Sequence, residues 1–101
     1  MSILSSASPD GKELTIFIKG RFDFSTHQDF RNAYESAPAT LTGYVVDLRE
    51  ATYLDSSALG MLLLLRDHAG GDGSRVRIVN CNPDVKKILA ISNFEQLFSI
   101  Q

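Results

Sequence analysis

An acidic residue and two hydroxyl residues, Asp55, Ser56 and Ser57, stand directly before a run of strong helix formers. Asp and Ser favour the N-cap of a helix because their side-chain oxygens accept hydrogen bonds from backbone N–H groups that the first turn leaves free. This pattern predicts a helix start, with Ser56 at its tip and near the surface. A helix start suits a negative charge, so a serine at this place is a good candidate for phosphorylation.

More than one role stays open for each of these side chains. Ser56 is either a phosphate acceptor or only a helix cap, and Ser57 is the alternative candidate for both roles. Asp55 either caps the helix, which is the everyday role of such a residue, or orients the Ser56 hydroxyl, or helps to hold a kinase-bound Mg²⁺.

Other chemistries find little support in the sequence. A serine hydrolase needs a base beside its nucleophile and an oxyanion hole, but His27 and His68 are isolated and no Gly-x-Ser-x-Gly segment is present. The glycine-rich segment 70–73 follows a predicted helix and precedes no Lys-Ser or Lys-Thr pair, so it does not match a phosphate-binding loop. Metal-ligand spacing is absent. We therefore expect a protein without catalytic activity, cofactor or metal.

The predicted helix after Asp55 must position these hydroxyls, and it is almost wholly apolar. At 100° per residue one line of side chains forms the expected core face, namely Ala58, Leu62, Leu65 and Ala69. Leu63 and Leu64 lie well off that line, so they either tuck under loops or contact a partner. The helix is expected to end near His68 or Ala69, because the segment 70–73, Gly-Gly-Asp-Gly, cannot continue it.

Four segments have the pattern of strands, at residues 1–8, 13–19, 44–48 and 76–80. The turn residues at 9–12 join the first two in a hairpin. We expect Gly20 to end the second strand, and we expect residues 21–24 and 49–54 to be connections. In those connections, Phe24 and Tyr53 are expected to wall the core near the Ser56 site.

Two further helices are predicted. Ser25 and Gln28 match a capping box for a helix over 26–36 that Pro38 stops. Asn82 precedes Pro83 at the start of the last helix, and residues 93–98 form a final helical turn or strand. The order β-β-α-β-α-β-α predicts a hairpin followed by right-handed βαβ units, in a mixed sheet with the strand 44–48 at its middle.

Length, charge and cysteine content give expectations about the number of domains, the class of partner and the cellular compartment. The 101 residues are expected to form one domain, 1–101. The net charge of −2 indicates neither a nucleic-acid partner nor an anionic membrane. The one cysteine, Cys81, cannot form an internal disulfide and is expected to be a small buried hydrophobe. No signal peptide is evident, and the longest apolar run is too short to span a bilayer, so we expect a cytoplasmic protein with no membrane insertion.

The segment from Tyr53 to Leu62, Tyr-Leu-Asp-Ser-Ser-Ala-Leu-Gly-Met-Leu, resembles the signature of STAS domains, the family of bacterial anti-sigma factor antagonists. Three other segments share the resemblance, Gly20-Arg-Phe-Asp23, Val45-Val-Asp-Leu48 and Cys81-Asn-Pro, so it extends across nearly the whole chain. Ala58 departs from the family, whose members often carry glycine there, and the change could alter how closely a partner approaches.

The resemblance implies an α/β fold: a STAS-type mixed sheet of four to five strands, packed with three to four α-helices. It also implies a mechanism. The unmodified protein binds an anti-sigma factor or related serine kinase, and the kinase phosphorylates the serine that follows the Asp, which is Ser56 here. A PP2C-type phosphatase reverses the modification. The chain is expected to be a monomer when free.

A phosphate on Ser56 adds about −1.5 to −2 charge beside Asp55, and beside Asp23 if the neighbouring loop is close. We expect one surface to bind the partner, made of Asp23, Asp55, Ser56, Ser57, Leu59, Gly60 and Leu63. The alternative for Asp23 is a solvated or locally capping loop residue. The alternative function is a constitutive STAS binding subunit of a transporter or larger signalling complex, with Ser56 never modified.

Overall fold

The computed structural model describes residues 3–37, 41–71 and 75–100. These residues form, in order, β1 (Ile3–Ala7), β2 (Glu13–Phe22), α1 (His27–Glu35), β3 (Gly43–Leu54), α2 (Ser56–His68), β4 (Val76–Val79), α3 (Pro83–Ile91) and β5 (Ser99–Ile100). Short 3-10 turns, η1 (Phe24–Thr26) and η3 (Phe94–Gln96), precede α1 and β5. The fold class inferred from the sequence, a mixed sheet of four to five strands with three to four helices, is confirmed.

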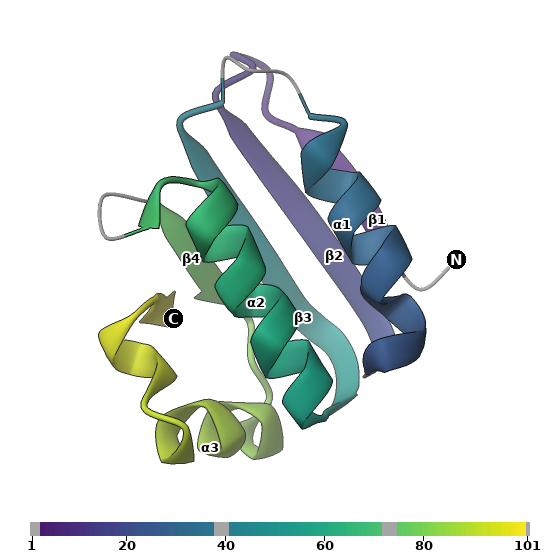
Figure 1. The fold of residues 1–101 in the computed structure, drawn as a ribbon, viewed down its shortest axis with the longest axis vertical. Helices are drawn as coiled ribbons and strands as arrows, with labels where there is room; N and C mark the ends of the chain where they lie inside the picture. The colour runs from purple at the N-terminus through teal and green to yellow at the C-terminus, as the bar shows by residue number, and fades with distance from the viewer. Residues whose placement is uncertain (1–2, 38–40, 72–74, 101) are drawn as a thin grey trace.

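The strands form one sheet in the order β1-β2-β3-β4-β5, so β3 lies at its centre as predicted. β1 and β2 pair antiparallel as the predicted hairpin, and β2, β3, β4 and β5 pair parallel to one another. Parallel neighbours require crossover connections, which the helices supply. The carboxyl ends of β2 and β3 therefore meet at one edge of the sheet, where the amino-terminal ends of α1 and α2 also lie (Figure 1), whereas β4 ends earlier, opposite Asp47 of β3.

Alternation along β2 shows which face of the sheet the helices cover. Leu14, Ile16 and Ile18 are buried, whereas the alternating residues Phe17 and Lys19 are exposed. Figure 1 shows α1 and α2 side by side over the same face of the sheet. The core accordingly lies between this face and the helices, and the outer face of β2 is open to solvent.

The helix α2 is anchored by the core face that the sequence predicts. Ala58, Leu62 and Leu65 are fully buried, and Ala69 packs partly buried against the same core. Met61 is buried as well. Each fully buried leucine contributes about 1.5–3 kcal/mol, so the two leucines fix the position of α2 on the sheet.

The strands β2 and β3 are longer than predicted. Gly20 does not end β2, because its positive φ of 79° accommodates a shift in the pairing with β3 and the strand continues to Phe22. The residues 49–54 are not a connection but the second half of β3, where Ala51 and Leu54 are buried. The polar residues between and beside them face solvent, so this part of the strand has no continuous apolar run by which it could be predicted.

The capping box predicted for the first helix is wrong. The Ser25 hydroxyl donates to Asp23 Oδ1 at 2.5 Å instead of capping α1. The helix begins at His27 after Thr26, whose side chain makes no capping hydrogen bond. The Gln28 side chain points along the helix and donates to Asn32 Oδ1. At the last helix the prediction is confirmed, because Asn82 Oδ1 accepts from the Val85 N–H at 2.9 Å.

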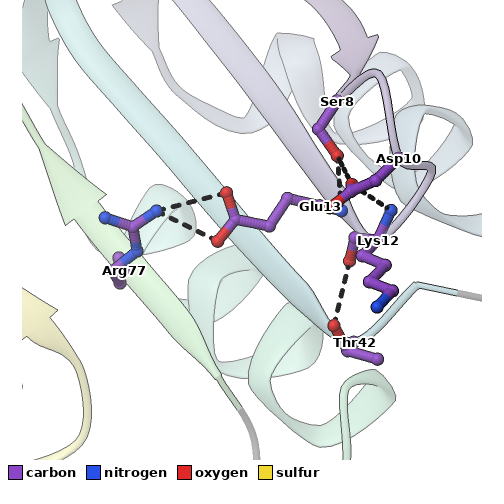
Figure 2. A network of polar contacts seen from close by, with 6 residues as sticks. All are labelled: Ser8, Asp10, Lys12, Glu13, Thr42 and Arg77. Carbon is purple, nitrogen blue, oxygen red and sulfur yellow. Dashed lines mark hydrogen bonds and ion pairs between the residues drawn. The ribbon is translucent and has the colours of Figure 1, made fainter.

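The β1–β2 turn is held by its own polar side chains (Figure 2). Asp10 Oδ1 accepts from the Ser8 hydroxyl at 2.6 Å and from the Lys12 N–H at 3.0 Å, which holds the pKa of the Asp10 carboxyl below its ordinary value. Next to the turn, Arg77 of β4 reaches across β3 to the carboxylate of Glu13 at 3.1 Å. This polar network lies at the edge of the sheet opposite the carboxyl ends of β2 and β3.

The predicted helix stop at Pro38, and Asp72 and Gly73 in the predicted stop of α2, lie outside the described residues.

Candidate functional site

Asp55 is the N-cap of α2. Its backbone is extended, and its Oδ1 accepts a hydrogen bond from the Ala58 N–H at 2.8 Å. Of the roles that the sequence left open, the capping role is the one for which the structure shows a contact. The cap also fixes the following residue, because Ser56 is then the first residue of the helix.

The Ser56 side chain is exposed at this helix tip, as predicted, whereas Ser57 is half-buried. An exposed hydroxyl at the first helical position is open to an enzyme that transfers a phosphoryl group. The backbone N–H groups of the first turn lie around it, and the positive end of the helix dipole favours a negative charge there. These features suit Ser56 better than Ser57 to carry a phosphate.

Asp23 lies beside this tip because β2 and β3 end together. Phe22 pairs with Leu54, and the Asp55 N–H donates to the Phe22 carbonyl at 3.4 Å, so the next residue of each chain segment lies at the same corner of the sheet. Asp23 is half-buried and caps η1. Its Oδ1 accepts from both the N–H and the hydroxyl of Ser25. The Ser25 hydroxyl, together with Arg21, lowers the pKa of the Asp23 carboxyl below its ordinary value.

An open apolar depression of about 460 Å³ lies along α2 next to the serines, lined by Phe24, His27, Ser57, Gly60, Met61 and Leu64. Two large apolar residues at the rim of this depression are strongly exposed: Phe24 is 65% and Leu64 is 59% accessible to solvent. The Phe24 ring stacks on the His27 ring with centroids 4.7 Å apart. Exposed apolar groups that gather around a hollow are typical of surfaces that bind other proteins.

The structure divides the predicted partner-binding residues into three groups. Asp23, Asp55 and Ser56 lie at the carboxyl ends of β2 and β3 and the tip of α2. Ser57 and Gly60 line the depression. Leu59 and Leu63 lie outside its lining; Leu59 packs partly buried against the core, and Leu63 is 38% exposed.

Two expectations about neighbouring apolar residues are wrong. Phe24 and Tyr53 do not wall the core, because both are exposed. Phe24 lies beyond the end of β2 on η1, and the Tyr53 ring faces the Arg21 guanidinium, whose carbon lies 4.5 Å from the ring centre. Leu63 and Leu64, for which the sequence left two alternatives open, are exposed and not tucked under loops. The signal for Leu64 was its angular distance from the core line; for Phe24, an aromatic residue just past a strand, the sequence offered none.

Ala58 does not lie at the surface of the site. It is fully buried, so its methyl group fills the core beneath α2.

Cys81 is half-buried rather than fully buried, and burial raises the pKa of its thiol above the ordinary value. Among the described residues no cluster of three or more His, Cys, Asp or Glu could hold a metal ion. Within the same residues, no helix combines the length and apolar character needed to cross a membrane.

Comparisons with known proteins agree with this geometry. The model of the family described as "Mlab, STAS domain" matches residues 5–99. A STAS-domain-containing protein of Pseudomonas aeruginosa strain UCBPP-PA14 is 68% identical over 100 residues, which cover 99% of each chain.

Solved structures resemble the fold at low sequence identity. The anti-sigma factor antagonist SpoIIAA in its unphosphorylated form is similar with a TM-score of 0.71 at 15% identity, over 98% of this chain and 86% of that one. The phosphorylated Bacillus SpoIIAA gives a TM-score of 0.66 at 15% identity, over 98% and 90%. A sulfate transporter family protein of Wolinella succinogenes gives 0.74 at 15% identity, over 90% and 74%. The family match over nearly the whole chain and the close Pseudomonas relative show that this chain belongs to the STAS domain family.

Proposed function

We propose that this STAS domain is an anti-sigma factor antagonist whose binding is switched by phosphorylation of Ser56. In its unmodified form it binds an anti-sigma factor that is also a serine kinase. Phosphorylation of Ser56 by that kinase releases the partner, and a PP2C-type phosphatase restores the binding form. The protein acts in the cytoplasm as a binding module without catalysis of its own.

The observation that carries this proposal is the place of the Ser56 hydroxyl. It is exposed at the first residue of α2, directly before Ser57, which lines the apolar depression with Phe24, Met61 and Leu64. A partner that covers the depression therefore passes close to the hydroxyl. A neutral serine is compatible with such a contact, and no other group of the site needs to change for binding.

Charge supplies the release. A phosphate adds about −1.5 to −2 charge at neutral pH, at a corner of the sheet that already holds Asp23 and Asp55. A partner packed there then faces a desolvated dianion, and like charges brought together across an interface cost several kcal/mol. Because each 1.4 kcal/mol is a tenfold change in affinity, this cost is enough to make the partner dissociate from the phosphorylated domain.

The fold is expected to survive the modification. The first turn of α2 offers free N–H groups and the positive end of its dipole to the phosphate, and Asp55 keeps its own contact with the Ala58 N–H. The likeness of the chain to SpoIIAA in both its unphosphorylated and its phosphorylated form supports a switch that leaves the scaffold in place.

Affinity capture from the native cells tests the proposal. Baits with Ser56→Ala and Ser56→Asp should retain different proteins, because only the first resembles the unmodified state. A Ser6→Asp bait is the matched control, since Ser6 is an exposed serine on β1, and it should retain the same partner as Ser56→Ala. Mass spectrometry of the native protein should find phosphate on Ser56. Identical captures with both Ser56 baits, together with an unmodified Ser56, would overturn the proposal.

The second candidate function is a constitutive subunit of a transporter or larger signalling complex. The similarity of the fold to a sulfate transporter family protein favours keeping it. It predicts a stoichiometric membrane complex that copurifies with the protein, no phosphate on Ser56, and no difference between the Ser56 baits. The same capture experiment therefore separates the two functions.

A further inference from the structure

We propose that Arg21 is the internal partner of a phosphate on Ser56: on phosphorylation its guanidinium leaves Asp23 and binds the phosphate. This inference rests on the proposed phosphorylation and adds a movement to it. The modification would then change the surface as well as its charge, because the movement of Arg21 uncovers the Tyr53 ring and one oxygen of Asp23.

The pairing of β2 with β3 places Arg21 near the helix tip. Arg21 pairs with Tyr53 and Phe22 with Leu54. Ser56 follows Tyr53 by three positions in the sequence, so at most about 10 Å of extended chain lies between the paired position and the Cα atom of Ser56. The guanidinium itself already lies at the corner, since Arg21 Nε donates to Asp23 Oδ2 at 3.3 Å. The movement that we propose is a change of the Arg21 side-chain rotamer.

Arg21 is held loosely where it is. The side chain is 68% exposed, and its contacts are one long hydrogen bond to Asp23 and the face of the Tyr53 ring at 4.5 Å. Exposed ion pairs of this kind contribute little to stability. Asp23 does not depend on Arg21 either, because its other oxygen, Oδ1, accepts both hydrogen bonds from Ser25. Asp23 can therefore keep its capping of η1 when Arg21 leaves.

A phosphate is the stronger partner for this guanidinium. It carries nearly twice the charge of a carboxylate and three acceptor oxygens, and the planar fork of arginine matches phosphate with two parallel hydrogen bonds. Arg21 is the basic residue that the described contacts place at this corner, beside two carboxylates that would otherwise repel the new charge. The exchange relieves that repulsion within the molecule, and it leaves Tyr53 and Asp23 free to meet a different partner.

Phosphorus NMR on the full chain tests the proposal. Phosphoserine is installed at position 56 during synthesis, so that neither kinase nor partner is needed, and the phosphate signal is titrated. A guanidinium in contact with the phosphate favours the dianion and lowers its second pKa. We expect this pKa to be about 0.5–1 unit lower in the wild-type background than with Arg21→Gln.

Arg77→Gln is the matched control. It removes the same charge from another exposed ion pair, with Glu13, but that pair lies at the opposite end of β2, eight residues or about 25 Å from Arg21. It should leave the phosphate pKa unchanged. The proposal would be overturned if the phosphate pKa were the same with and without Arg21. It would also be overturned if Arg77→Gln changed the phosphate pKa as much as Arg21→Gln does.

A second measurement does not depend on a substituted chain. The Nε–Hε signal of Arg21 should shift when the wild-type chain carries phosphoserine at position 56, whereas that of Arg77 should not. An Arg21 signal that stays in place would contradict the exchange. Neither result depends on partner release, so this inference can fail while the proposed switch stands, and a switch that fails in cells leaves the exchange of Arg21 measurable.

Discussion

Removing the Asp55 cap should loosen the helix that presents Ser56. In Asp55→Ala the Ala58 N–H loses its acceptor, which lies at 2.8 Å in the native structure. Loss of an N-cap costs about 0.5–2 kcal/mol, and for a domain of about 100 residues each kcal/mol lowers Tm by about 4–8 °C. We therefore expect Tm to fall by about 4–8 °C, with a cost near 1 kcal/mol at the centre of that range.

Asp55→Asn separates the hydrogen bond from the charge. Asparagine caps a helix about as well as aspartate, so this variant should keep most of the stability and lose only the charge–dipole term, which is about 0.3–1 kcal/mol. Thermal unfolding followed by circular dichroism should rank the variants as wild type, then Asn, then Ala. A wild-type Tm for Asp55→Ala, or an Asn variant as unstable as the Ala variant, would refute the role of the hydrogen bond.

Hydrogen exchange locates the effect. The Ala58 amide should exchange faster in Asp55→Ala than in the wild type, whereas the amide of Leu65, deep in α2, should change only with the global stability. If the Ala58 amide kept its full protection without the Asp55 carboxylate, another group would have to satisfy it. The helix tip, and with it the presentation of the Ser56 hydroxyl, would then rest on a different contact.

Four further predictions follow from the same contacts. Asp23 has a lowered pKa in the folded chain, so its stabilising effect is present above the unfolded pKa and is lost as the pH falls through the folded value; the loss of Tm caused by Asp23→Asn should therefore be full at pH 7 and shrink as the pH falls through the acid range, and a loss that stays equal across this range would be inconsistent with this. Burial raises the pKa of Cys81, so the native thiol should react with alkylating reagents more slowly than the same thiol in denaturant, and equal rates would count against the burial. Leu62→Ala should lower the free energy of unfolding by about 2–5 kcal/mol in a denaturant titration, because the side chain is fully buried; a loss below about 1 kcal/mol would show that α2 is not anchored there. Phe24→Ser and Leu64→Ser should each change stability by about 0.5 kcal/mol or less while weakening binding of the captured partner, and undiminished binding would place the partner elsewhere.

The architecture could be predicted from sequence patterns because β2 and α2 each bury one face and expose the other. The alternation of Leu14, Ile16 and Ile18 predicted β2, and the line through Ala58, Leu62 and Leu65 predicted the buried side of α2. Both patterns reflect the repeat of the backbone itself, two residues in a strand and 3.6 in a helix. The order of the elements then left few topologies to consider.

The boundaries were harder to predict because local signals compete with tertiary pairing. Gly20 looks like a strand end, yet its positive φ serves a shift of register inside β2. Ser25 looks like a helix cap, but the Asp23 carboxylate captures its hydroxyl. In both cases the deciding partner is a neighbouring strand or a nearby side chain that a pattern of residue types does not show.

The candidate site divides in the same way. The Asp55 cap and the exposed Ser56 could be predicted because capping is a local property of helix starts. The exposure of Phe24, by contrast, depends on how η1 leaves the end of β2. The meeting of Arg21 with Tyr53 depends on the register of two parallel strands, which residue types alone do not determine.

The most direct measurement of the central claim is the affinity of the captured partner for two forms of the full chain, unmodified and with phosphoserine at position 56. Isothermal titration of both forms, with amide NMR spectra to verify that each is folded, gives the comparison. If phosphorylation of Ser56 switches binding, the phosphorylated form should have at least about a tenfold higher Kd, equivalent to 1.4 kcal/mol, with spectral changes confined to the corner around Asp23, Asp55 and the first turn of α2. Equal affinities of two folded forms, or spectral changes spread through the core, would contradict it.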